Sequence, residues 1–454
     1  MPTIKAVLAT LLGLAAWASH AQQPIAFRNV NVVPMDAERV LEAQNVIVRG
    51  ERIEAVGPAA DTAIPADARV IDGAGHYLVP GLAEMHAHVP GVDDPRYVEE
   101  VLFLYVANGV TTARGMLGEP GHLQLRERLR RHEVLGPRLY TSGPSLNDRS
   151  VGSPEEAARI VREQARDGYD FVKVHPGLTR AEYDAAVDAA EAAGIDLAGH
   201  VPEAVGVLRA IEARQATIDH LDGYVQFLLP EQSESGTPAA GFFGLGIADL
   251  ADRSKIPAAA AATAAAGVWV VPTQTLIEHW AAPSPTAEEL AARPEMRYVP
   301  PAMRQQWLRA KRQLTEGADY SPAKARALVE VRRALVKALH DAGAGLLLGS
   351  DAPQVFNVPG FSLHHELAAV VAAGLSPYEA LRTGTANPAV FFDAEDAFGT
   401  IQAGLAADLV LVEGNPLVDV GVLAQPAGVM VRGRWLDRAE LDAGLAAIAE
   451  RHAR

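Results

Sequence analysis

The stretch that decides the fold is Tyr77-Leu78-Val79-Pro80-Gly81-Leu82 followed by Met85-His86-Ala87-His88. An apolar run of this kind predicts a buried strand, and residues two apart in a strand point to the same side. His86 and His88 can therefore bind one metal ion together from a strand end. Alone the pair is a weak signal, because a His-x-His is more often one packed and one solvated histidine.

Four further polar residues each lie at the end of an apolar, strand-like run, in chain order. They are Lys173, His200, His220 and Asp351. Helical segments rich in Ala, Glu and Arg lie between these runs, near 154–167, 179–193, 203–213 and 321–342. Strands that alternate with helices predict a parallel sheet. A (β/α)8 barrel places its active site at the carboxyl ends of its strands, so the six side chains are expected to meet there.

With these residues the chain resembles the amidohydrolase superfamily, in particular its imidazolonepropionase-like and prolidase-like (Xaa-Pro dipeptidase-like) branch. The resemblance covers nearly everything after about residue 22. It includes Gly349-Ser350-Asp351, Leu363-His364-x-Glu366-Leu367 and Gly404-x-x-Ala407-Asp408-Leu409. This ordered set is specific for the superfamily and less specific for a substrate.

The resemblance implies a binuclear centre in which six side chains hold two divalent metal ions. The implied ligands are His86, His88 and Asp351 for one ion, His200 and His220 for the other, and Lys173 for both. Lys173 would bridge the ions as a carbamate formed with carbon dioxide, because burial and nearby cations disfavour its ammonium form. The chain has no cysteine, so histidine and oxygen ligands favour zinc, with manganese or iron as alternatives.

The implied reaction is cleavage of an amide bond by a metal-activated hydroxide. Two metal ions about 3.5–4 Å apart lower the pKa of a shared water and polarise a carbonyl oxygen. Asp351 is the candidate catalytic residue, because a carboxylate beside that water can accept its proton and deliver it to the leaving nitrogen. The expected substrate is small: a dipeptide of the Xaa-Pro type or an N-acyl amino acid.

Two other functions stay open. His200-Val201-Pro202-Glu203 matches the His-x-x-Glu of mononuclear deaminases in the same superfamily, and a deaminase or cyclic-amide hydrolase is the enzymatic alternative. The simpler interpretation is that Glu203 begins the following helix, where the helix dipole favours a carboxylate. His175 is a rival polar group beside Lys173. A non-catalytic binding or scaffold barrel would be expected to lack ligands, and all six positions are present.

Three further residues are predicted to bind the substrate. Tyr224 follows His220 by four residues and matches a tyrosine that helps to bind the substrate carboxylate in prolidase-like relatives. His364 opens a helix after the last strand of the barrel, and Arg114 ends the second strand. For each of the three, support of neighbouring groups is the alternative role.

The predicted fold class is α/β, a (β/α)8 TIM barrel with a small discontinuous β-sandwich domain built from both termini. Residues 25–78 and 395–440 carry short strands bounded by turn residues and are assigned to the sandwich, and 79–390 to the barrel. The barrel exceeds the ~250 residues of a minimal one. Its insertions at 224–252 and 276–320 emerge on the catalytic face and contain aromatic residues, which predicts ordered covers.

Charge and the N-terminus limit the partners. A net charge of −16 argues against nucleic acid or an anionic membrane surface and favours a small-molecule substrate. Lys5, the apolar run 6–18 and Ser19-His20-Ala21 predict a signal peptide at 1–21 and a periplasmic or secreted enzyme. The apolar run is shorter than the ~20 residues that span a bilayer, so no stable membrane insertion is expected. The sequence is compatible with a homo-oligomer.

Overall fold

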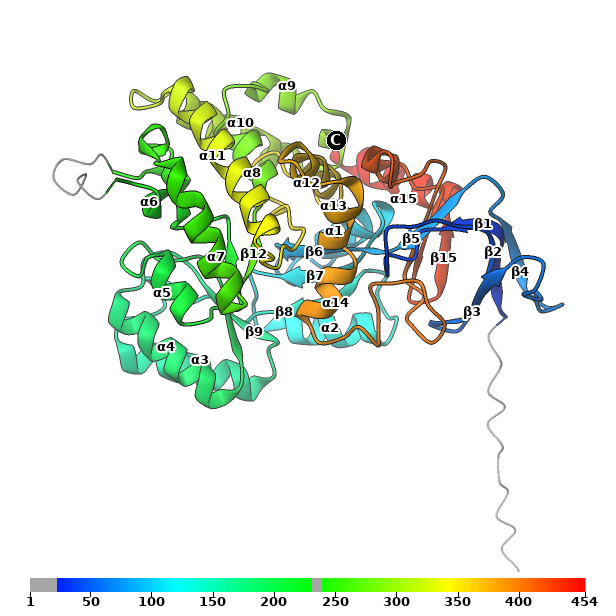
Figure 1. Cartoon of the computed structure of the whole chain (residues 1–454). Helices are drawn as coiled ribbons and strands as arrows, with labels where there is room; N and C mark the ends of the chain where they lie inside the picture. Colours follow the sequence, from blue (N-terminus) through cyan, green and yellow to red (C-terminus); the bar gives the residue numbers. More distant parts are fainter. Residues whose placement is uncertain (1–22, 231–238, 454) are drawn as a thin grey trace, which may run out of the picture.

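Strands from both ends of the chain form one sheet in the computed structural model, which describes residues 23–230 and 239–453. The sheet has eight strands: β1 (Ile25–Val32), β2 (Leu41–Arg49), β3 (Arg52–Pro58), β4 (Arg69–Asp72), β5 (Tyr77–Pro80), β13 (Leu409–Val412), β14 (Gly428–Val431) and β15 (Arg434–Asp437). Their order is β15-β14-β13-β5-β1-β2-β3, with β4 on β1. Antiparallel pairing of β13 with β5 joins the two ends, and Figure 1 shows β15, from near the end of the chain, in the same part of the molecule as β1, β2 and β5.

A second group of strands is entirely parallel. It comprises β6 (Leu82–Ala87), β7 (Val110–Gly115), β8 (Arg138–Thr141), β9 (Phe171–Val174), β10 (Asp196–Gly199), β11 (Thr217–Asp219) and β12 (Trp269–Val271). Parallel bridges close the gaps between them. Ser142 pairs with Phe171, and the segment 346–352 pairs with Val270 on one side and Ala87 on the other. The segment 346–352 is thus the eighth strand of a closed barrel, as the sequence predicts.

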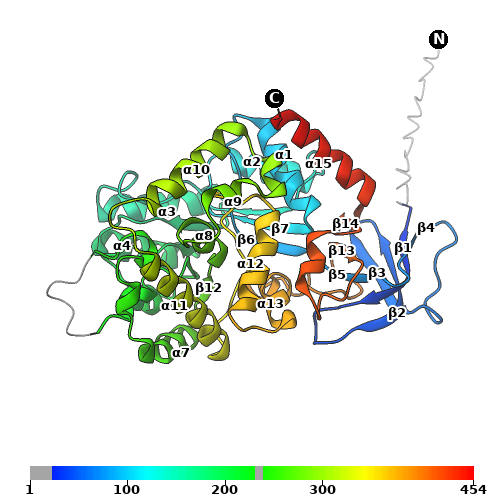
Figure 2. The same ribbon diagram turned by 90° about the horizontal axis from the view of Figure 1, so that it is seen from above.

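Helices surround the barrel (Figure 2). They are α1 (Pro95–Ala107), α2 (Gly121–Arg130), α3 (Pro154–Asp167), α4 (Arg180–Ala193), α5 (Val207–Glu212), α6 (Tyr224–Phe227), α7 (Ile256–Ala266), α8 (Gln274–Trp280), α9 (Ala287–Ala291), α10 (Pro301–Thr315), α11 (Pro322–Asp341), α12 (Phe361–Ala372), α13 (Pro377–Thr383), α14 (Ala386–Phe391) and α15 (Arg438–His452), with short 3-10 turns η2 (Phe242–Gly244), η3 (Ala248–Leu250), η4 (Arg253–Lys255), η5 (Pro294–Tyr298) and η6 (Val420–Ala424). Within the described parts of the chain, none of these helices is long and apolar enough to cross a bilayer.

Local signals explain where the helices begin and end. The Ser153 side chain caps α3, and the helix ends at Gly168 in a left-handed conformation, both common helix boundaries. The predicted helix 203–213 begins later than expected, because Gly206 has a φ of 75° and α5 starts at Val207. Glu203 therefore lies in a turn with an exposed side chain. The prediction that it begins the helix is wrong.

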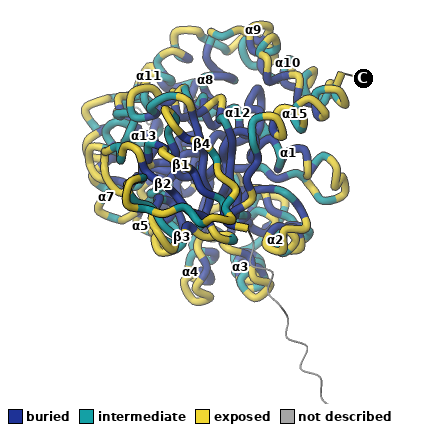
Figure 3. The backbone as a smooth tube through the Cα atoms, turned by 90° about the vertical axis from the view of Figure 1, so that its right-hand side faces the viewer, coloured by how far each residue is buried: buried dark blue, intermediate teal, exposed yellow. Residues whose placement is uncertain are grey.

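The centre of the molecule is buried, and exposed segments lie around it (Figure 3). Every residue of β6, β7, β9 and β11 is buried, as expected for parallel strands covered by helices. The described residues of both insertions are folded against this centre. Phe242 contacts Trp280 with ring centroids 4.7 Å apart, and Tyr298 stacks on Phe361 at 5.2 Å.

Glu366 on α12 fixes the start of α8. The fully buried carboxylate accepts hydrogen bonds from Gln274 N at 2.8 Å and Thr275 N at 2.6 Å. These two amides belong to the first turn of α8, where backbone N–H groups lack partners within the helix. The contact joins α8, which follows β12, to α12, which follows the eighth strand.

Replacing Glu366 with Gln should change how stability depends on pH. Burial raises the pKa of Glu366 from 4.5 to about 7, so between these pH values the folded state holds a proton that the unfolded state releases. The wild type therefore loses up to about 3 kcal/mol as pH rises through this window. The variant should lack that loss, although an unpaired amide lowers its stability by about 1–3 kcal/mol throughout. Urea unfolding at pH 5 and 8 measures both effects. An equal change in the free energy of unfolding between the two pH values for both proteins would contradict the prediction. Glu191→Gln, at an exposed position, is the matched control.

Candidate metal centre

The six predicted ligands meet at the carboxyl ends of the barrel strands. His88 Nε2 lies 2.9 Å from Asp351 Oδ1, and His86 Nε2 lies 3.6 Å from the same oxygen. Lys173 Nζ lies 3.3 Å from His86 Nε2. The ring centroid of His220 lies 4.5 Å from that of His86 and 4.4 Å from that of His200. Side chains from five strands thus form one contiguous group.

Two of the four imidazoles form a hydrogen bond through Nδ1, and Nδ1 of a third lies close to a carboxylate oxygen. His86 Nδ1 lies 2.9 Å from Asp219 Oδ2. His200 Nδ1 lies 2.7 Å from Asp222 Oδ2, and His220 Nδ1 lies 2.9 Å from Thr273 Oγ1. Nε2 of His86 instead faces Lys173 and Asp351, and the use of Nδ1 for a protein group with Nε2 toward the other ligands is the usual pattern of metal-binding histidines.

The donor atoms fit a divalent metal ion. The ligand atoms of His86, His88 and Asp351 all lie within 4.8 Å of one another. His220 Nε2 is buried and has no hydrogen-bond partner within the described residues. Neutral imidazoles and a carboxylate suit zinc, manganese or iron.

Asp219 balances the buried cations beneath this group. Its carboxylate is completely buried and lies 3.5 Å from Arg114 Nη2 and 3.7 Å from Lys173 Nζ. Burial alone would raise the pKa of Asp219, but the two cations bring it below its usual value. Burial lowers the pKa of Lys173, so its ammonium form is less favoured than that of an exposed lysine. Burial also lowers the pKa of His86 and His220 well below the ordinary value, which keeps both imidazoles neutral.

Backbone geometry makes room for the ligands. A Cβ on Gly199 would lie 2.6 Å from Lys173 Cδ, and a Cβ on Gly349 would lie 2.9 Å from His86 N. His220 and Asp351 both have a φ of 62°, a left-handed conformation that costs non-glycine residues about 1–3 kcal/mol and is frequent at functional sites. The surrounding contacts must hold these two ligands in place.

Comparison with known proteins identifies the family. The sequence profile described as "Amidohydrolase family" matches residues 77–436. The chain belongs to the amidohydrolase family. The predicted family and barrel fold are therefore confirmed, and the expected enzyme class, hydrolases acting on carbon–nitrogen bonds, is the class of this family.

Individual relatives agree with this membership. A bottromycin amidohydrolase structure is 24% identical with a TM-score of 0.72, over 94% of this chain and 90% of that one. A putative prolidase from Bifidobacterium longum is 23% identical with a TM-score of 0.67, over 94% and 99%. Adenine deaminase 1 of Jannaschia sp. (strain CCS1) is 32% identical over 88 residues. Those residues are 19% of this chain and 14% of the relative, so the chain matches a small part of that relative's length.

The three predicted substrate-binding residues of this amidohydrolase are all buried in the protein. Tyr224 is fully buried, and its hydroxyl is 2.7 Å from Thr263 Oγ1 on α7, which argues against a role in binding the substrate carboxylate. Arg114 is fully buried between the rings of Phe171 and Phe391, at 5.3 and 5.2 Å. It donates to Met85 O at 2.8 Å and so supports the ligands from below.

His364 is also buried away from solvent on α12. Burial lowers its pKa to about 4, and neither ring nitrogen has a hydrogen-bond partner within the described residues. None of the ligand contacts described above involves it. His175, the rival polar group, lies beside the centre with its ring 4.9 Å from that of His200.

Supporting residues that the sequence analysis missed hold the strand ends. Glu84 is buried and accepts from His86 N at 2.9 Å and Ser350 N at 2.8 Å, which ties β6 to the eighth strand. Arg332 on α11 donates to the carbonyl oxygens of His220 and Pro272, and thereby ties β11 to β12. Buried charges within otherwise apolar segments were the available signal, since such residues are rarely buried without a partner.

Asp219 and Asp222 were missed as histidine partners. The available signal was their position, because Asp219 precedes His220 directly and Asp222 follows it by two residues. Carboxylates commonly accept from metal-binding histidines. Which histidine each carboxylate would face depends on the packing of strands that are distant in the sequence.

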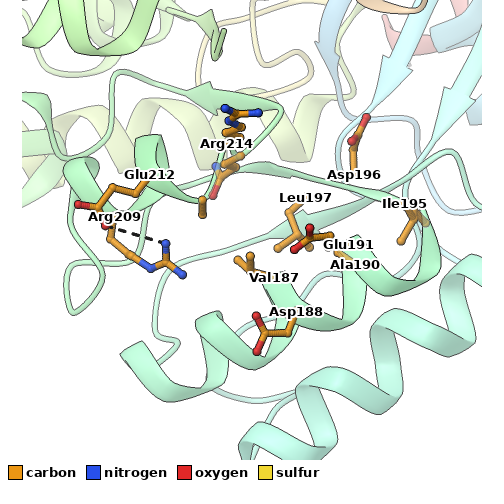
Figure 4. A pocket seen from close by; sticks show the side chains of 12 residues that line it. Val187, Asp188, Ala190, Glu191, Ile195, Asp196, Leu197, Arg209, Glu212 and Arg214 are labelled. Atoms are coloured by element: carbon orange, nitrogen blue, oxygen red, sulfur yellow. Dashed lines mark ion pairs between the residues drawn. The ribbon is translucent and has the colours of Figure 1, made fainter. Parts of the chain in front are cut away.

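Two cavities lie at opposite ends of the barrel. One, of about 250 Å³, is lined by His200, Asp222, Glu203, Phe242 and Phe243 among others and opens beside the metal-ligand group. The other, of about 500 Å³, lies between α4 and α5 at the start of β10 (Figure 4). Barrel enzymes act at the carboxyl ends of the strands, so the first cavity is the candidate substrate site.

Asp219→Asn should weaken metal binding. The variant keeps the shape of the side chain and removes the charge that balances Arg114 and Lys173. Loss of one partner from a buried ion pair is expected to lower the free energy of unfolding by about 3–5 kcal/mol. Loss of the carboxylate beside His86 Nδ1 is expected to weaken metal binding by about 10- to 100-fold. Chelator competition and urea unfolding measure the two effects. Asp188→Asn, an exposed position near the opposite end of the barrel, should change neither. Unchanged metal affinity in Asp219→Asn would contradict the assigned role.

Proposed function

We propose that this chain is a binuclear metal-dependent amidohydrolase that cleaves the amide bond of a small substrate, a dipeptide or an N-acyl amino acid. The observation that carries the proposal is the contiguous group of four imidazoles, Lys173 and Asp351, in which two imidazoles form a hydrogen bond through Nδ1 and Nδ1 of a third lies 2.9 Å from a carboxylate oxygen. Such an arrangement has the donors that a hydrolytic metal centre needs. The name of one structural neighbour, a putative prolidase, is compatible with a dipeptide substrate.

The proposed centre takes His86, His88 and Asp351 as ligands of one ion and His200 and His220 as ligands of the other. Zinc is the proposed metal. Bound divalent ions would supply a water of lowered pKa and polarise the scissile carbonyl.

Lys173 is proposed to bridge the ions as a carbamate. Its ammonium group must first lose a proton, which its lowered pKa makes easier. The amine nitrogen can then form a bond to the carbon of carbon dioxide and release a second proton. The product is an anion in place of a cation. This change would supply an oxygen ligand and remove a buried positive charge 3.3 Å from His86 Nε2.

Asp351 is proposed to transfer the proton. Its Oδ1 lies toward His86 and His88, whereas its Oδ2 is 3.9 Å from His220 Nδ1. A carboxylate in this position can accept a proton from the attacking water and return it to the leaving nitrogen. Asn357 Nδ2 donates to Ser350 O, which helps to fix the backbone that carries Asp351.

A mononuclear deaminase is the second candidate. The similarity to an adenine deaminase and the turn that carries Glu203 beside His200 favour it. Elemental analysis and an ammonia assay with adenine separate the candidates. One metal per chain with ammonia release would favour the deaminase, and two metals without it would favour the amide hydrolase.

Lys173→Ala tests the proposed bridge. The variant should hold fewer than two metals per chain and lose activity by orders of magnitude, because the bridging anion is lost. Short carboxylic acids should restore part of the metal content and part of the activity of this variant. Bicarbonate should speed the reconstitution of the wild-type apoenzyme with metal. Metal content by elemental analysis and hydrolysis of a dipeptide and N-acyl amino acid library provide the readouts. A variant with two metals and full activity would refute the assignment of Lys173.

We also propose that the enzyme is exported. The proposal rests on Lys5, the apolar run and Ser19-x-Ala21, a stretch outside the described residues. Export would remove residues 1–21. Intact-mass measurement of protein from its native host should show a chain that begins at Gln22, and retention of Met1 would contradict export.

A further inference from the structure

The cavity beside His200 has an acidic and aromatic lining. Its charged side chains among the described residues are Glu203 and Asp222, and it is lined by neither lysine nor arginine there. Asp222 is engaged by His200 Nδ1 at 2.7 Å. Glu203 is exposed and forms no ion pair with any described residue, so its carboxylate is available to a ligand.

Phe242 and Phe243 form the apolar wall of this cavity and connect it to the metal-ligand group. The Phe243 ring lies 5.4 Å from that of His220 and 6.5 Å from that of His200. Phe242 meets Phe243 edge to face at 4.7 Å. Phe243 has left-handed dihedral angles, φ 48° and ψ 31°, which are rare for an aromatic residue and aim its ring at the two histidines.

The dimensions suit half of a small substrate. At about 250 Å³ the cavity is smaller than the ~300–1,000 Å³ typical of sites for whole drug-sized ligands. A substrate with its scissile carbonyl at the ligand group would extend one end into the cavity. That end would meet aromatic rings near the histidines and a carboxylate at Glu203.

We propose that this cavity binds the amino-terminal half of the substrate, with a free ammonium at Glu203 and an apolar or aromatic side chain against Phe242 and Phe243. The inference rests on the proposed function, since it takes the scissile carbonyl to lie at the ligand group. It selects between the two substrate classes: a dipeptide or aminoacyl amide with a free amine fits, and an N-acyl amino acid does not. The net charge of −16 also attracts a cationic end.

Binding of amine probes to the metal-loaded enzyme tests the site without requiring catalysis. Phenethylamine carries the ammonium and the ring, and 2-phenylethanol has a neutral hydroxyl in place of the amine. Calorimetry should give roughly three- to tenfold tighter binding of phenethylamine, the range for a hydrogen-bonded ion pair that is partly exposed. Glu203→Gln should reduce this ratio to about one. Glu191→Gln, an exposed carboxylate near the opposite end of the barrel, should leave it unchanged, and Phe242→Ala should weaken both probes alike.

Equal binding of the two probes by the wild type, or an unchanged ratio in Glu203→Gln, would overturn the inference. Hydrolysis of Phe-Pro and N-acetyl-Phe-Pro provides the kinetic counterpart. A preference for the free dipeptide that Glu203→Gln removes supports the site. Amide cleavage that is indifferent to acetylation and to Glu203→Gln overturns it and leaves the proposed function intact. If the wild type binds phenethylamine more tightly than 2-phenylethanol but cleaves no amide, the ammonium site is supported and the proposed function is refuted.

Discussion

Burial of several charges at one end of the barrel is the constraint on which the rest of the structure depends. Lys173, Arg114 and Asp219 are all completely buried, and an unpaired buried ion costs several kcal/mol. The carboxylate of Asp219 lies against both cations and against His86 Nδ1. One anion therefore offsets two cations and also fixes the orientation of an imidazole. Conversion of Lys173 to a carbamate would reverse the sign of one partner, so Arg114 would then balance Asp219.

The remaining contacts hold the ligand group in a geometry that its own backbone disfavours. His220 and Asp351 have left-handed φ values, and both lie at strand ends that other residues tie down. Arg332 binds the His220 carbonyl, and Glu84 binds the backbone next to Asp351. Arg332 comes from α11 outside the barrel and Glu84 from β6 within it, so the chemistry at the centre depends on packing in both layers.

Sequence patterns predict those parts of the molecule that depend on local order. The helix predicted at 154–167 coincides with α3, because a Ser-Pro start and a glycine end define it. The six ligands could be found because each ends an apolar run. Tyr224 could not be placed in this way: α6 has four residues and turns the hydroxyl toward Thr263, 39 residues further along. Glu203 was assigned to a helix that Gly206 delays. Both outcomes depend on turns and on distant packing partners.

The central claim is that these six side chains bind two metal ions bridged by a modified lysine. Crystals of the zinc-loaded enzyme, measured with anomalous scattering at the zinc edge, test it most directly. The account predicts two peaks about 3.5–4 Å apart, one beside His86, His88 and Asp351 and the other beside His200 and His220, with density continuing beyond Lys173 Nζ to both. A single peak, or an unmodified Lys173 amine in the fully loaded enzyme, would contradict it.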